Sequence, residues 1–305
     1  MRAAICTIST KGHLFKTKAL FHSLSGMTDA KFHCLVTDVG NESVLESEIQ
    51  QVLLSELKDG PATSIKAKYS GDKLRWACKP LLLLHLLNNG YDRVIYVDND
   101  IYFYSSPVFL FDSLNEHSVI LTPHNYLASA EERQYWLEAT YRIGLYNAGF
   151  IGVNQHGKES MQWWAKCCAY NVKKSSWRGL FDDQRYLDLM PVLFDHVHVE
   201  KHPGCNVAGW NTDRCQRSLN KDGEVVLNDR WPLVFVHYNG FTMRAILNGS
   251  DELLRTHLDS YFQILKKFDP SFSPKRITSY GSMDGVNFLR HICWHIARYF
   301  DRITV

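Results

Sequence analysis

Short apolar runs alternate with segments of helical spacing through the first third of the chain. The runs AAICTI at residues 3–8 and KFHCLVTD at 31–38 predict two strands, and the spacing of ALFHSL at 19–24 predicts a helix between them. Strand, helix and strand in this order are typical of the opening of a wound α/β sheet.

Two more helices are predicted before the next strand. Residues 41–58 have apolar side chains at helical spacing, namely Val44, Leu45, Ile49, Val52, Leu53 and Leu57. Residues 79–90, KPLLLLHLLNNG, predict a helix that Pro80 begins and an Asn-Gly pair ends. This helix leads into a strand at 93–97, RVIYV.

Strands and helices continue to alternate beyond this point. The predicted elements are a strand at 118–123, a polar helix at 129–141, a strand at 147–154, a Trp-rich helix at 159–171, a helix at 182–194 that Pro191 stops, and a strand at 233–240. Residues 202–211, HPGCNVAGWN, are too rich in glycine and too polar for a strand and predict a shaped loop.

Length and composition favour one α/β domain with an appendage. The chain has 305 residues, of which 45% are hydrophobic, and this suffices to bury a core. It contains no internal repeat, low-complexity segment or long linker. We therefore expect one domain over residues 1–250 and a C-terminal helical, basic amphipathic segment over 251–305.

Charge and cysteine content narrow the class of protein. The 34 Lys and Arg and 32 Asp and Glu leave a net charge of +2, which argues against a nucleic-acid binder dominated by phosphate contacts. The eight cysteines form no Cys-x-x-Cys pair, which favours a reduced, cytoplasmic chain. The N-terminus is typical of a first strand rather than a signal peptide, and no apolar run approaches the roughly 18–20 residues that span a bilayer.

The apolar run RVIYVDNDIYFY at 93–104 is interrupted by Asp98, Asn99 and Asp100. Unpaired carboxylates inside a sheet are costly, so these two need a partner or must lie where the strand leaves the core. Side chains two apart in an extended chain point the same way, and Mg²⁺ or Mn²⁺ commonly binds one or two carboxylates together with substrate phosphates. The alternative is a solvated turn between the two strands of a hairpin.

A second polar side chain, His237, ends the apolar strand VFVH. Imidazole is a ligand for Mn²⁺, and Gly240, three residues later, would let the backbone approach a phosphate closely. A single histidine can instead be structural. Combined with Asp98 and Asp100, the pattern favours a metal ligand.

Two further motifs carry amide and carboxylate side chains. Asn147-Ala-Gly149 leads into an apolar run, and Asp183-Gln184 lies at the start of the helix predicted at 182–194. Such side chains hydrogen-bond sugar hydroxyls because they offer fixed planar acceptors, and the amides add donors. Either motif alone could be a turn or a helix cap.

The order of these four motifs resembles that of the retaining nucleotide-sugar glycosyltransferases with the GT-A fold, glycosyltransferase family 8 and its bacterial lipopolysaccharide and capsule relatives. The resemblance covers roughly residues 1–245. It implies a Rossmann-like mixed central sheet flanked by helices. It also implies transfer, with retention, of a hexose from a UDP-sugar to a hydroxyl of a bacterial surface glycan. The implied partners are a UDP-hexose donor and a glycan or lipid-linked glycan acceptor.

The resemblance implies a role for individual residues. Asp98, Asp100 and His237 would bind Mn²⁺ or Mg²⁺ against the donor diphosphate. Asp183 and Gln184 would be catalytic and lie beside the donor sugar, with Gln184 near the anomeric carbon. The donor-binding residues would be Thr7, Arg75, Lys79, Asp98, Asn147, Gly149, Gly240 and Arg244. For the phosphates, Arg75 and Lys79 are preferred over Lys73, and the alternative for all three is an ordinary charged helix start.

The histidine motif departs from the family pattern, which usually continues as His-x-x-Gly-x-x-Lys-Pro. Met243 stands at the lysine position and Arg244 follows it, so we expect Arg244 to supply the phosphate contact. A neighbouring bacterial glycosyltransferase family of the same fold therefore fits as well as family 8. We expect the loop at 202–211 to form a wall of the sugar or acceptor site through Asn206 and Trp210, although Trp210 could instead be structural.

Residues 287–305 have the pattern of an amphipathic helix. Its apolar face consists of Phe288, Leu289, Ile292, Ile296, Tyr299, Phe300 and Ile303. From residue 255 onward, eight Lys and Arg stand against four Asp and Glu. A basic, aromatic helix is typical of a segment on an anionic membrane surface, and docking on its own domain is the alternative. Related lipopolysaccharide transferases carry such tails, so the resemblance implies a peripheral place on the inner face of the inner membrane.

Two other functions stay open. A metal-dependent phosphohydrolase could use Asp98 as its nucleophile, but this leaves the motifs at Asn147 and Gln184 unexplained. The second alternative is an inactive module that binds a sugar nucleotide or a glycan. The sequence does not identify the donor sugar, because candidate hexoses differ by one hydroxyl or substituent and pocket shape selects among them.

Overall fold

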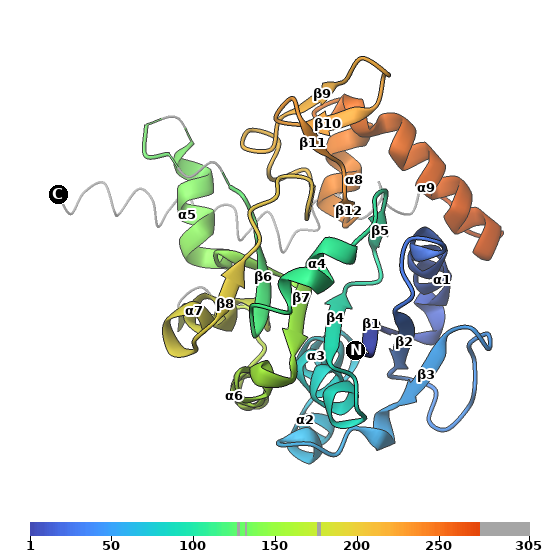
Figure 1. Cartoon of the computed structure of the whole chain (residues 1–305), viewed down its shortest axis with the longest axis vertical. Helices are drawn as coiled ribbons and strands as arrows, with labels where there is room; N and C mark the ends of the chain where they lie inside the picture. Colours follow the sequence, from blue (N-terminus) through green and yellow to red (C-terminus); the bar gives the residue numbers. More distant parts are fainter. Residues whose placement is uncertain (127–128, 132, 176–177, 275–305) are drawn as a thin grey trace, which may run out of the picture. The chain divides into compact units, whose positions relative to one another are not determined.

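The computed structural model describes residues 1–126, 129–131, 133–175 and 178–274 (Figure 1). Residues 1–270 form one compact unit. Among the described helices, none is both long and apolar enough to cross a membrane. The seven cysteines of the described part are all free thiols.

A seven-stranded sheet forms the centre of this unit, with the strand order β3-β2-β1-β4-β7-β6-β8. The strands are β1 (Ala3–Ser9), β2 (Lys31–Val36), β3 (Gln50–Leu53), β4 (Arg93–Val97), β6 (Val119–Pro123), β7 (Tyr146–Asn154) and β8 (Val197–Val199). Only β7 runs antiparallel to its neighbours β4 and β6, and the other pairs are parallel. The predicted mixed α/β sheet is therefore confirmed.

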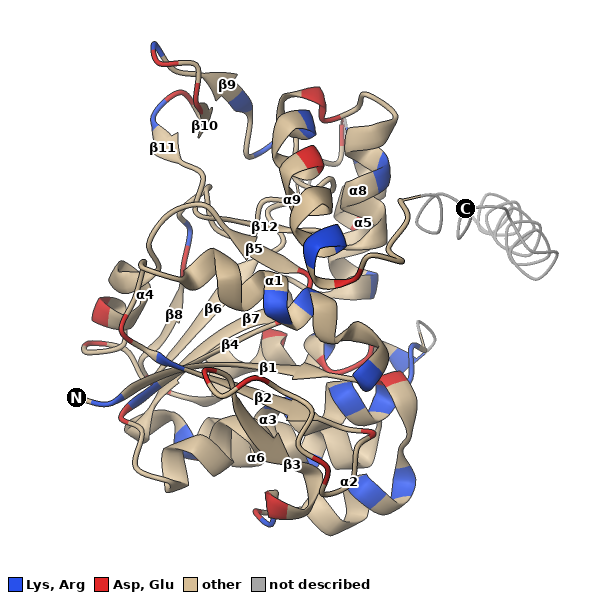
Figure 2. Cartoon of the chain, turned by 90° about the vertical axis from the view of Figure 1, so that its right-hand side faces the viewer, with Lys and Arg blue, Asp and Glu red and all other residues tan. Residues whose placement is uncertain are grey.

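Helices cover both faces of the sheet because side chains of a strand alternate between faces. Ala4 and Cys6 pack in the core that contains α2 (Ala62–Lys68), α3 (Gly71–Asn88) and α6 (Lys158–Tyr170). Ile5 packs on the opposite side with α1 (Leu14–Leu24) and α4 (Val108–Ser113). Figures 1 and 2 show these two layers of helices on either side of the sheet.

Smaller elements surround the carboxyl ends of the central strands. Two-stranded and three-stranded antiparallel sheets consist of β5 (Ile101–Phe103) with β12 (Phe235–His237), and of β9 (Arg217–Leu219), β10 (Val225–Leu227) and β11 (Trp231–Pro232). The other helices are α5 (Gln134–Ile143), α7 (Met190–Leu193), α8 (Gly240–Leu247) and α9 (Arg255–Phe268). Single-turn or short 3₁₀ helices occupy Lys11–His13, Leu54–Glu56, Gln155–Gly157, Gln184–Leu189 and Glu252–Leu254. Basic and acidic positions are interspersed over these elements (Figure 2).

The helix predicted over residues 41–58 is wrong. Residues 50–53 form β3 instead, which pairs in parallel with β2 and buries Val52. The side chain of Gln51 accepts a hydrogen bond from the Val44 amide and donates one to the Glu42 carbonyl, which fixes the preceding loop. Pairing with a neighbouring strand outweighs the helical spacing here, because sheet formation depends on partners distant in sequence.

Two prolines lie elsewhere in their helices than predicted. Pro80 does not begin α3 but lies inside it, and the helix starts at Gly71. The burial of the leucine-rich turns around Pro80 compensates for the lost backbone hydrogen bond. Pro191 does not stop a helix but lies in the first turn of α7, where its missing N–H costs nothing.

Two further observations concern the C-terminal half. The strand β8 lies in the histidine-rich stretch that carried no strand prediction. Beyond the predicted domain boundary at residue 250, α9 packs on α1 and α8 within the same compact unit. Residues 275–305, which include the predicted amphipathic helix, lie outside the described residues, so that helix stays a prediction.

Candidate functional site

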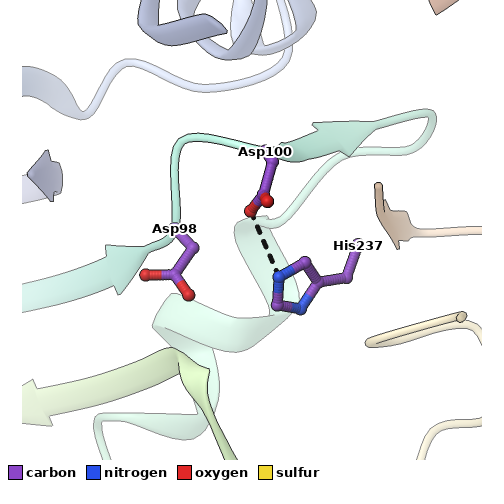
Figure 3. A group of neighbouring side chains, drawn as sticks. All are labelled: Asp98, Asp100 and His237. Carbon is purple, nitrogen blue, oxygen red and sulfur yellow. Dashed lines mark ion pairs between the residues drawn. The ribbon is translucent and has the colours of Figure 1, made fainter. Parts of the chain in front are cut away.

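Two carboxylates and an imidazole meet where β4 leaves the sheet (Figure 3). Asp98 and Asp100 flank a turn between β4 and β5, and β12 pairs with β5 so that His237 lies opposite Ile101. One ligand atom from each of Asp98, Asp100 and His237 lies within 4.8 Å of the other two. The turn does not join a hairpin, because β4 pairs with β1 and β7 whereas β5 pairs with β12.

Asp100 and His237 stabilise each other's charged form. The Nε2 atom of His237 lies 3.1 Å from the Oδ1 atom of Asp100. Burial alone would lower the pKa of His237, but the Asp100 carboxylate raises it above its ordinary value. Burial likewise opposes the charge on Asp100, but His237 holds the pKa of this carboxyl well below its usual range. The pair is therefore ionised in the absence of a ligand.

The donor set fits a divalent cation. Carboxylate oxygens and an imidazole nitrogen are ligands that Mn²⁺ accepts, and Mg²⁺ accepts the oxygens. The Nδ1 atom of His237 is buried and has no hydrogen-bond partner among the described residues. Buried polar atoms normally have partners, so this nitrogen leaves a donor or acceptor in the site unused by the described residues.

Lys79 supplies the charge that neutralises Asp98. Its ammonium lies 3.2 Å from Asp98 and 3.2 Å from Asp183, and it donates to the Ala148 carbonyl at 2.9 Å. Burial opposes its charge, but Asp183 and Asp98 raise the pKa of Lys79. The hydroxyl of Tyr96 also donates to Asp98 at 2.7 Å. The carboxylate at the end of β4 is therefore paired rather than solvated.

Asp183 and Gln184 lie at the start of the 3₁₀ helix Gln184–Leu189. Burial raises the pKa of Asp183 to about 7 although Lys79 opposes this change. The indole of Trp164 donates to the backbone carbonyl of Asp183, and the amide of Gln184 donates to the carbonyl of Ile143 at 3.2 Å. These contacts fix Asp183 and Gln184 in the wall of the cavity that Asp98, Asp100 and His237 also line.

Asn147 and Gly149 come from β7, beside the metal-ligand candidates. The Oδ1 atom of Asn147 accepts from the Gly149 amide at 2.8 Å, and its Nδ2 atom lies 3.3 Å from Nε2 of His124. The Nδ1 atom of His124 lies 3.0 Å from the Gly144 carbonyl and must donate to it, so Nε2 accepts from Asn147. Burial lowers the pKa of His124 to about 4, which keeps this ring neutral.

These side chains line one cavity of about 460 Å³, which we call the strand-end cavity. The predicted residues that line it are Lys79, Asp98, Asp100, Asn147, Gly149, Asp183, Gln184, Trp210 and His237. Its size is in the range of small-molecule sites. Residues that the sequence predicted on separate strands and loops are thus brought together at one edge of the sheet.

Several lining residues were not predicted as site residues. They are Trp76, His124, Tyr126, Tyr135, Trp136, Ile143, Ala148, Lys174, Phe181, Asp182, Asn239 and Phe241. Asp182 and Asn239 lie inside motifs already identified and could have been named from the sequence. The aromatic rings carry no sequence signal of this kind, because a buried aromatic residue is most often part of a core.

Five predicted site residues do not line the strand-end cavity. Thr7 is buried in β1, and Arg75 forms an ion pair with Asp72 one turn earlier in α3. Asn206 is buried and donates to the Pro123 carbonyl at 3.2 Å. The other two are Gly240 and Arg244. Both belong to α8, and the guanidinium of Arg244 lies beside Gly240, the first residue of this helix. Contacts of these residues with a donor stay predictions, as does that of Lys73, which is exposed on α3.

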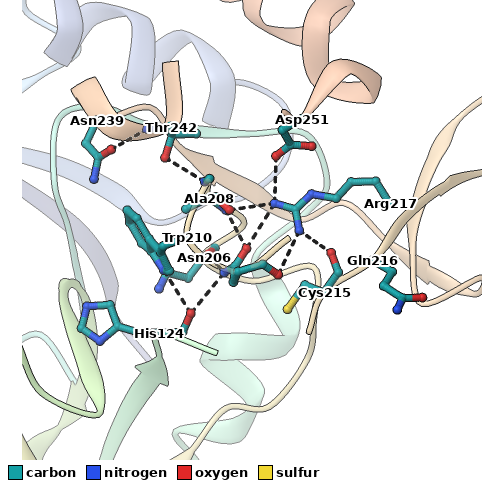
Figure 4. A network of polar contacts seen from close by, with 12 residues as sticks. His124, Asn206, Ala208, Trp210, Cys215, Gln216, Arg217, Asn239, Thr242 and Asp251 are labelled. Carbon is teal, nitrogen blue, oxygen red and sulfur yellow. Dashed lines mark hydrogen bonds and ion pairs between the residues drawn. The ribbon is translucent and has the colours of Figure 1, made fainter. Parts of the chain in front are cut away.

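A buried ion pair holds the loop that carries Trp210 (Figure 4). The guanidinium of Arg217 lies 3.1 Å from Asp251 and donates to the carbonyls of Ala208, Asn211 and Cys215. The indole of Trp210 donates to the His124 carbonyl at 3.0 Å. The predicted shaped loop is therefore present, and its tryptophan is anchored at the cavity wall by its own N–H group.

Comparisons with known sequences identify two relatives in Bacillus subtilis (strain 168), and no family model matches the chain. The uncharacterized protein YfnF is 30% identical over 295 residues, which cover 90% of this chain and 97% of YfnF. The uncharacterized protein YfnD is 31% identical over 250 residues, which cover 78% of this chain and 77% of YfnD.

Solved structures share the fold at low sequence identity. Mouse xyloside xylosyltransferase 1, in its apo form, matches with a TM-score of 0.51 at 12% identity, over 79% of this chain and 99% of that chain. The galactosyltransferase LgtC, in complex with donor and acceptor sugar analogs, matches with a TM-score of 0.52 at 13% identity, over 90% of this chain and 99% of that chain. The chain therefore has the GT-A fold of these glycosyltransferases, as the resemblance implied, whereas membership of family 8 stays a prediction.

Proposed function

We propose that this chain, which belongs to the same family as the Bacillus subtilis protein YfnF, is a metal-dependent glycosyltransferase. It transfers a hexose from a UDP-sugar to a hydroxyl group of a bacterial surface glycan, with retention at the anomeric carbon. The observation that carries the proposal is that Asp98, Asp100 and His237 face the same cavity as Asp183 and Gln184 in a protein of the GT-A fold.

The cation, Mn²⁺ or Mg²⁺, would be held by Asp98, Asp100 and His237. When bound, it offsets the negative charge that develops on the leaving diphosphate. One ligand atom from each of these three residues lies within 4.8 Å of the other two, which supports this assignment.

Lys79 has a positioning role in this proposal. Its buried ammonium lies between Asp98 and Asp183 and keeps both carboxyl groups in place. A fixed, buried charge such as that of Lys79 needs no reorganisation during the reaction.

The donor sugar would lie against β7 and the start of the 3₁₀ helix. Asp183 and Gln184 would provide acceptors and donors for its hydroxyls. Retention follows if the acceptor hydroxyl attacks from the face that the nucleotide leaves, with Gln184 beside the anomeric carbon.

The test is transfer by the purified protein. Incubation with UDP-sugars, Mn²⁺ and a panel of glycan acceptors is expected to release UDP and form a glycoside detectable by mass spectrometry. Asp98→Asn is expected to abolish both while the fold survives. Asp112→Asn, at an exposed position in α4, is the matched control and is expected to retain turnover.

Other products would replace the proposal. Release of inorganic phosphate from phosphorylated substrates without an acceptor would favour the phosphohydrolase. Binding of UDP-sugars with neither transfer nor hydrolysis would favour an inactive binding module. Full activity of Asp98→Asn would contradict the role of the metal. The cytoplasmic, membrane-peripheral location remains a proposal that rests on the sequence alone.

A further inference from the structure

A second cavity of about 690 Å³ lies beside the strand-end cavity, and we call it the basic cavity. The two share His124 and Tyr126 in their walls. The ring of His124 stacks on that of Tyr126 with centroids 4.8 Å apart, and Tyr126 stacks on Trp136 at 4.9 Å. A short aromatic stack thus forms part of the boundary between the two cavities.

Three cations line the basic cavity, and no carboxylate does. Lys201 follows β8, Arg214 lies in the loop before β9, and Arg230 lies just before β11. All three are exposed, and within the described residues none of them forms an ion pair. Positively charged side chains from three segments distant in sequence therefore meet in this one cavity.

Nearby acidic residues do not cancel this charge in the cavity wall. Glu200, Asp213 and Asp229 each precede one of the three cations, but none of them lines the cavity. Glu200 accepts from the His202 amide at 2.8 Å. Asp213 pairs with Arg133 at 3.2 Å. Asp229 is exposed in the turn after β10.

The segments that carry two of the cations are held in place. The guanidinium of Arg230 lies 4.6 Å from the centre of the Trp231 ring. The rings of Trp231 and His202 are steeply inclined to each other, with their centres 4.7 Å apart. Arg214 lies between Asn211 and Cys215 in the chain, and the backbone carbonyls of these two residues both accept hydrogen bonds from the buried Arg217. A preorganised cation loses less freedom on binding a ligand, which favours binding over adventitious charge.

We propose that the basic cavity binds the acceptor glycan through an oxyanion that the glycan carries, either a carboxylate or a phosphate. This inference rests on the proposed glycosyltransferase function and adds the class of acceptor to it. Arginine guanidinium groups match the planar geometry of carboxylates and phosphates. Tyr126 and Trp231 add apolar surface to the wall of the cavity. The shared wall would place a hydroxyl of this acceptor next to the donor sugar.

The test measures equilibrium binding of three matched probes by titration calorimetry, with and without UDP and Mn²⁺. The probes are cellobiose, cellobiouronic acid and cellobiose 6′-phosphate, which share a backbone and differ in charge. We expect at least one acidic probe to bind about tenfold more tightly than cellobiose, with a preference that weakens as ionic strength rises. Whichever acid binds more tightly identifies a uronic-acid glycan or a phosphorylated glycan.

Single variants then locate the binding site. Lys201→Gln, Arg214→Gln and Arg230→Gln are each expected to weaken binding of the preferred acidic probe by about two- to fivefold, the value of one exposed charge pair. Cellobiose binding is expected to change little. Lys221→Gln is the matched control, because Lys221 is exposed in the turn between β9 and β10 and does not line the cavity.

Three results would overturn the inference. They are equal affinities of the wild-type protein for cellobiose and both acids, an equal loss in Lys221→Gln, and displacement of the acidic probe by UDP alone. Transfer to neutral acceptors only would reject this inference while the proposed function stands. Binding of acidic probes without any binding of UDP-sugars would reject the proposed function, and the basic cavity would then be an acidic-glycan site.

Discussion

Gly149 lies where Asn147, Asp98 and His237 approach one another in the strand-end cavity. A Cβ atom at this position would lie 2.5 Å from Oδ1 of Asn147, 2.7 Å from Cε1 of His237 and 3.1 Å from Oδ2 of Asp98. Any side chain here would push against all three functional groups at once. Close approach, rather than an unusual backbone angle, is therefore the reason for glycine.

Gly149→Ala is expected to destabilise the protein by about 1–3 kcal/mol, as overpacking does, and to abolish metal-dependent stabilisation by nucleotides. Differential scanning fluorimetry measures both effects. The control is Gly152→Ala on the same strand, where the added Cβ would lie 3.3 Å from Ile120 and 3.4 Å from Leu114 in the core. Persistence of metal-dependent stabilisation in Gly149→Ala would show that this space is not used.

Lys79 is the residue whose loss should cost most stability in the site. Lys79→Met leaves Asp98 and Asp183 without their shared cation, and we expect a loss of about 3–5 kcal/mol in the free energy of unfolding. Urea denaturation measures this loss. The double variant Lys79→Met with Asp183→Asn is expected to lose less, because one unpaired charge is removed.

A matched change on the surface provides the comparison for this prediction. Lys166→Met replaces an exposed lysine of α6, and we expect little change in stability. A Lys79→Met protein as stable as Lys166→Met would contradict the role given to the buried ion pairs.

At the scale of elements, strand ends supply most of the site. Asp98 follows β4, His237 ends β12 and Asn147 lies near the start of β7, which runs opposite to β4. The sequence predicted these positions because a polar group at the end of an apolar run is unusual and costly unless it has a partner. The strands themselves were predicted because their apolar runs are short and sharply bounded by polar residues.

Elements whose residues depend on distant partners were predicted less well. The short strands β3 and β8 lie at the two edges of the central sheet, where only one neighbour contributes. The partner that neutralises Asp98 is Lys79, nineteen positions earlier, and the sequence assigned this lysine to a phosphate instead. No local pattern encodes which charge lies beside which carboxylate, because the fold decides it.

The loop from Asn206 to Arg217 depends on one buried ion pair. Arg217→Met would leave Asp251 buried without a cation and remove the donors to three loop carbonyls. We expect a loss of about 3–5 kcal/mol in stability and a change in the fluorescence of Trp210. Lys221→Met, four residues later and exposed, is the control. Unchanged stability of Arg217→Met would mean that the loop is held by other contacts.

At the scale of the whole molecule, buried neutral histidines make stability depend on pH. Burial lowers the pKa of His33 and of His124 to about 4, whereas an unfolded chain has a histidine pKa of about 6.5. The unfolded chain therefore takes up protons at higher pH than the folded protein does. The stability that these two neutral histidines contribute is therefore complete above the unfolded pKa and is lost as the pH falls toward 4.

Between pH 7 and pH 5 we expect these two histidines to cost about 2 kcal/mol of stability each. Urea denaturation at both pH values measures the loss. His33→Gln keeps a hydrogen-bonding group beside Tyr91, but glutamine does not titrate. Between pH 7 and pH 5 this variant is therefore expected to lose less stability than the wild type, by the amount that His33 contributes. The same pH dependence in the variant and the wild type would contradict the assignment.

Thermal stabilisation by a panel of UDP-sugars, measured with and without Mn²⁺, tests whether the strand-end cavity is a metal-dependent nucleotide-sugar site. A ligand that binds only the folded protein raises its melting temperature. We predict a rise that requires both the nucleotide sugar and the cation, that Asp112→Asn preserves and that Asp100→Asn abolishes. A rise that is the same without Mn²⁺ and in Asp100→Asn, or no rise with any UDP-sugar, would contradict the account of this site.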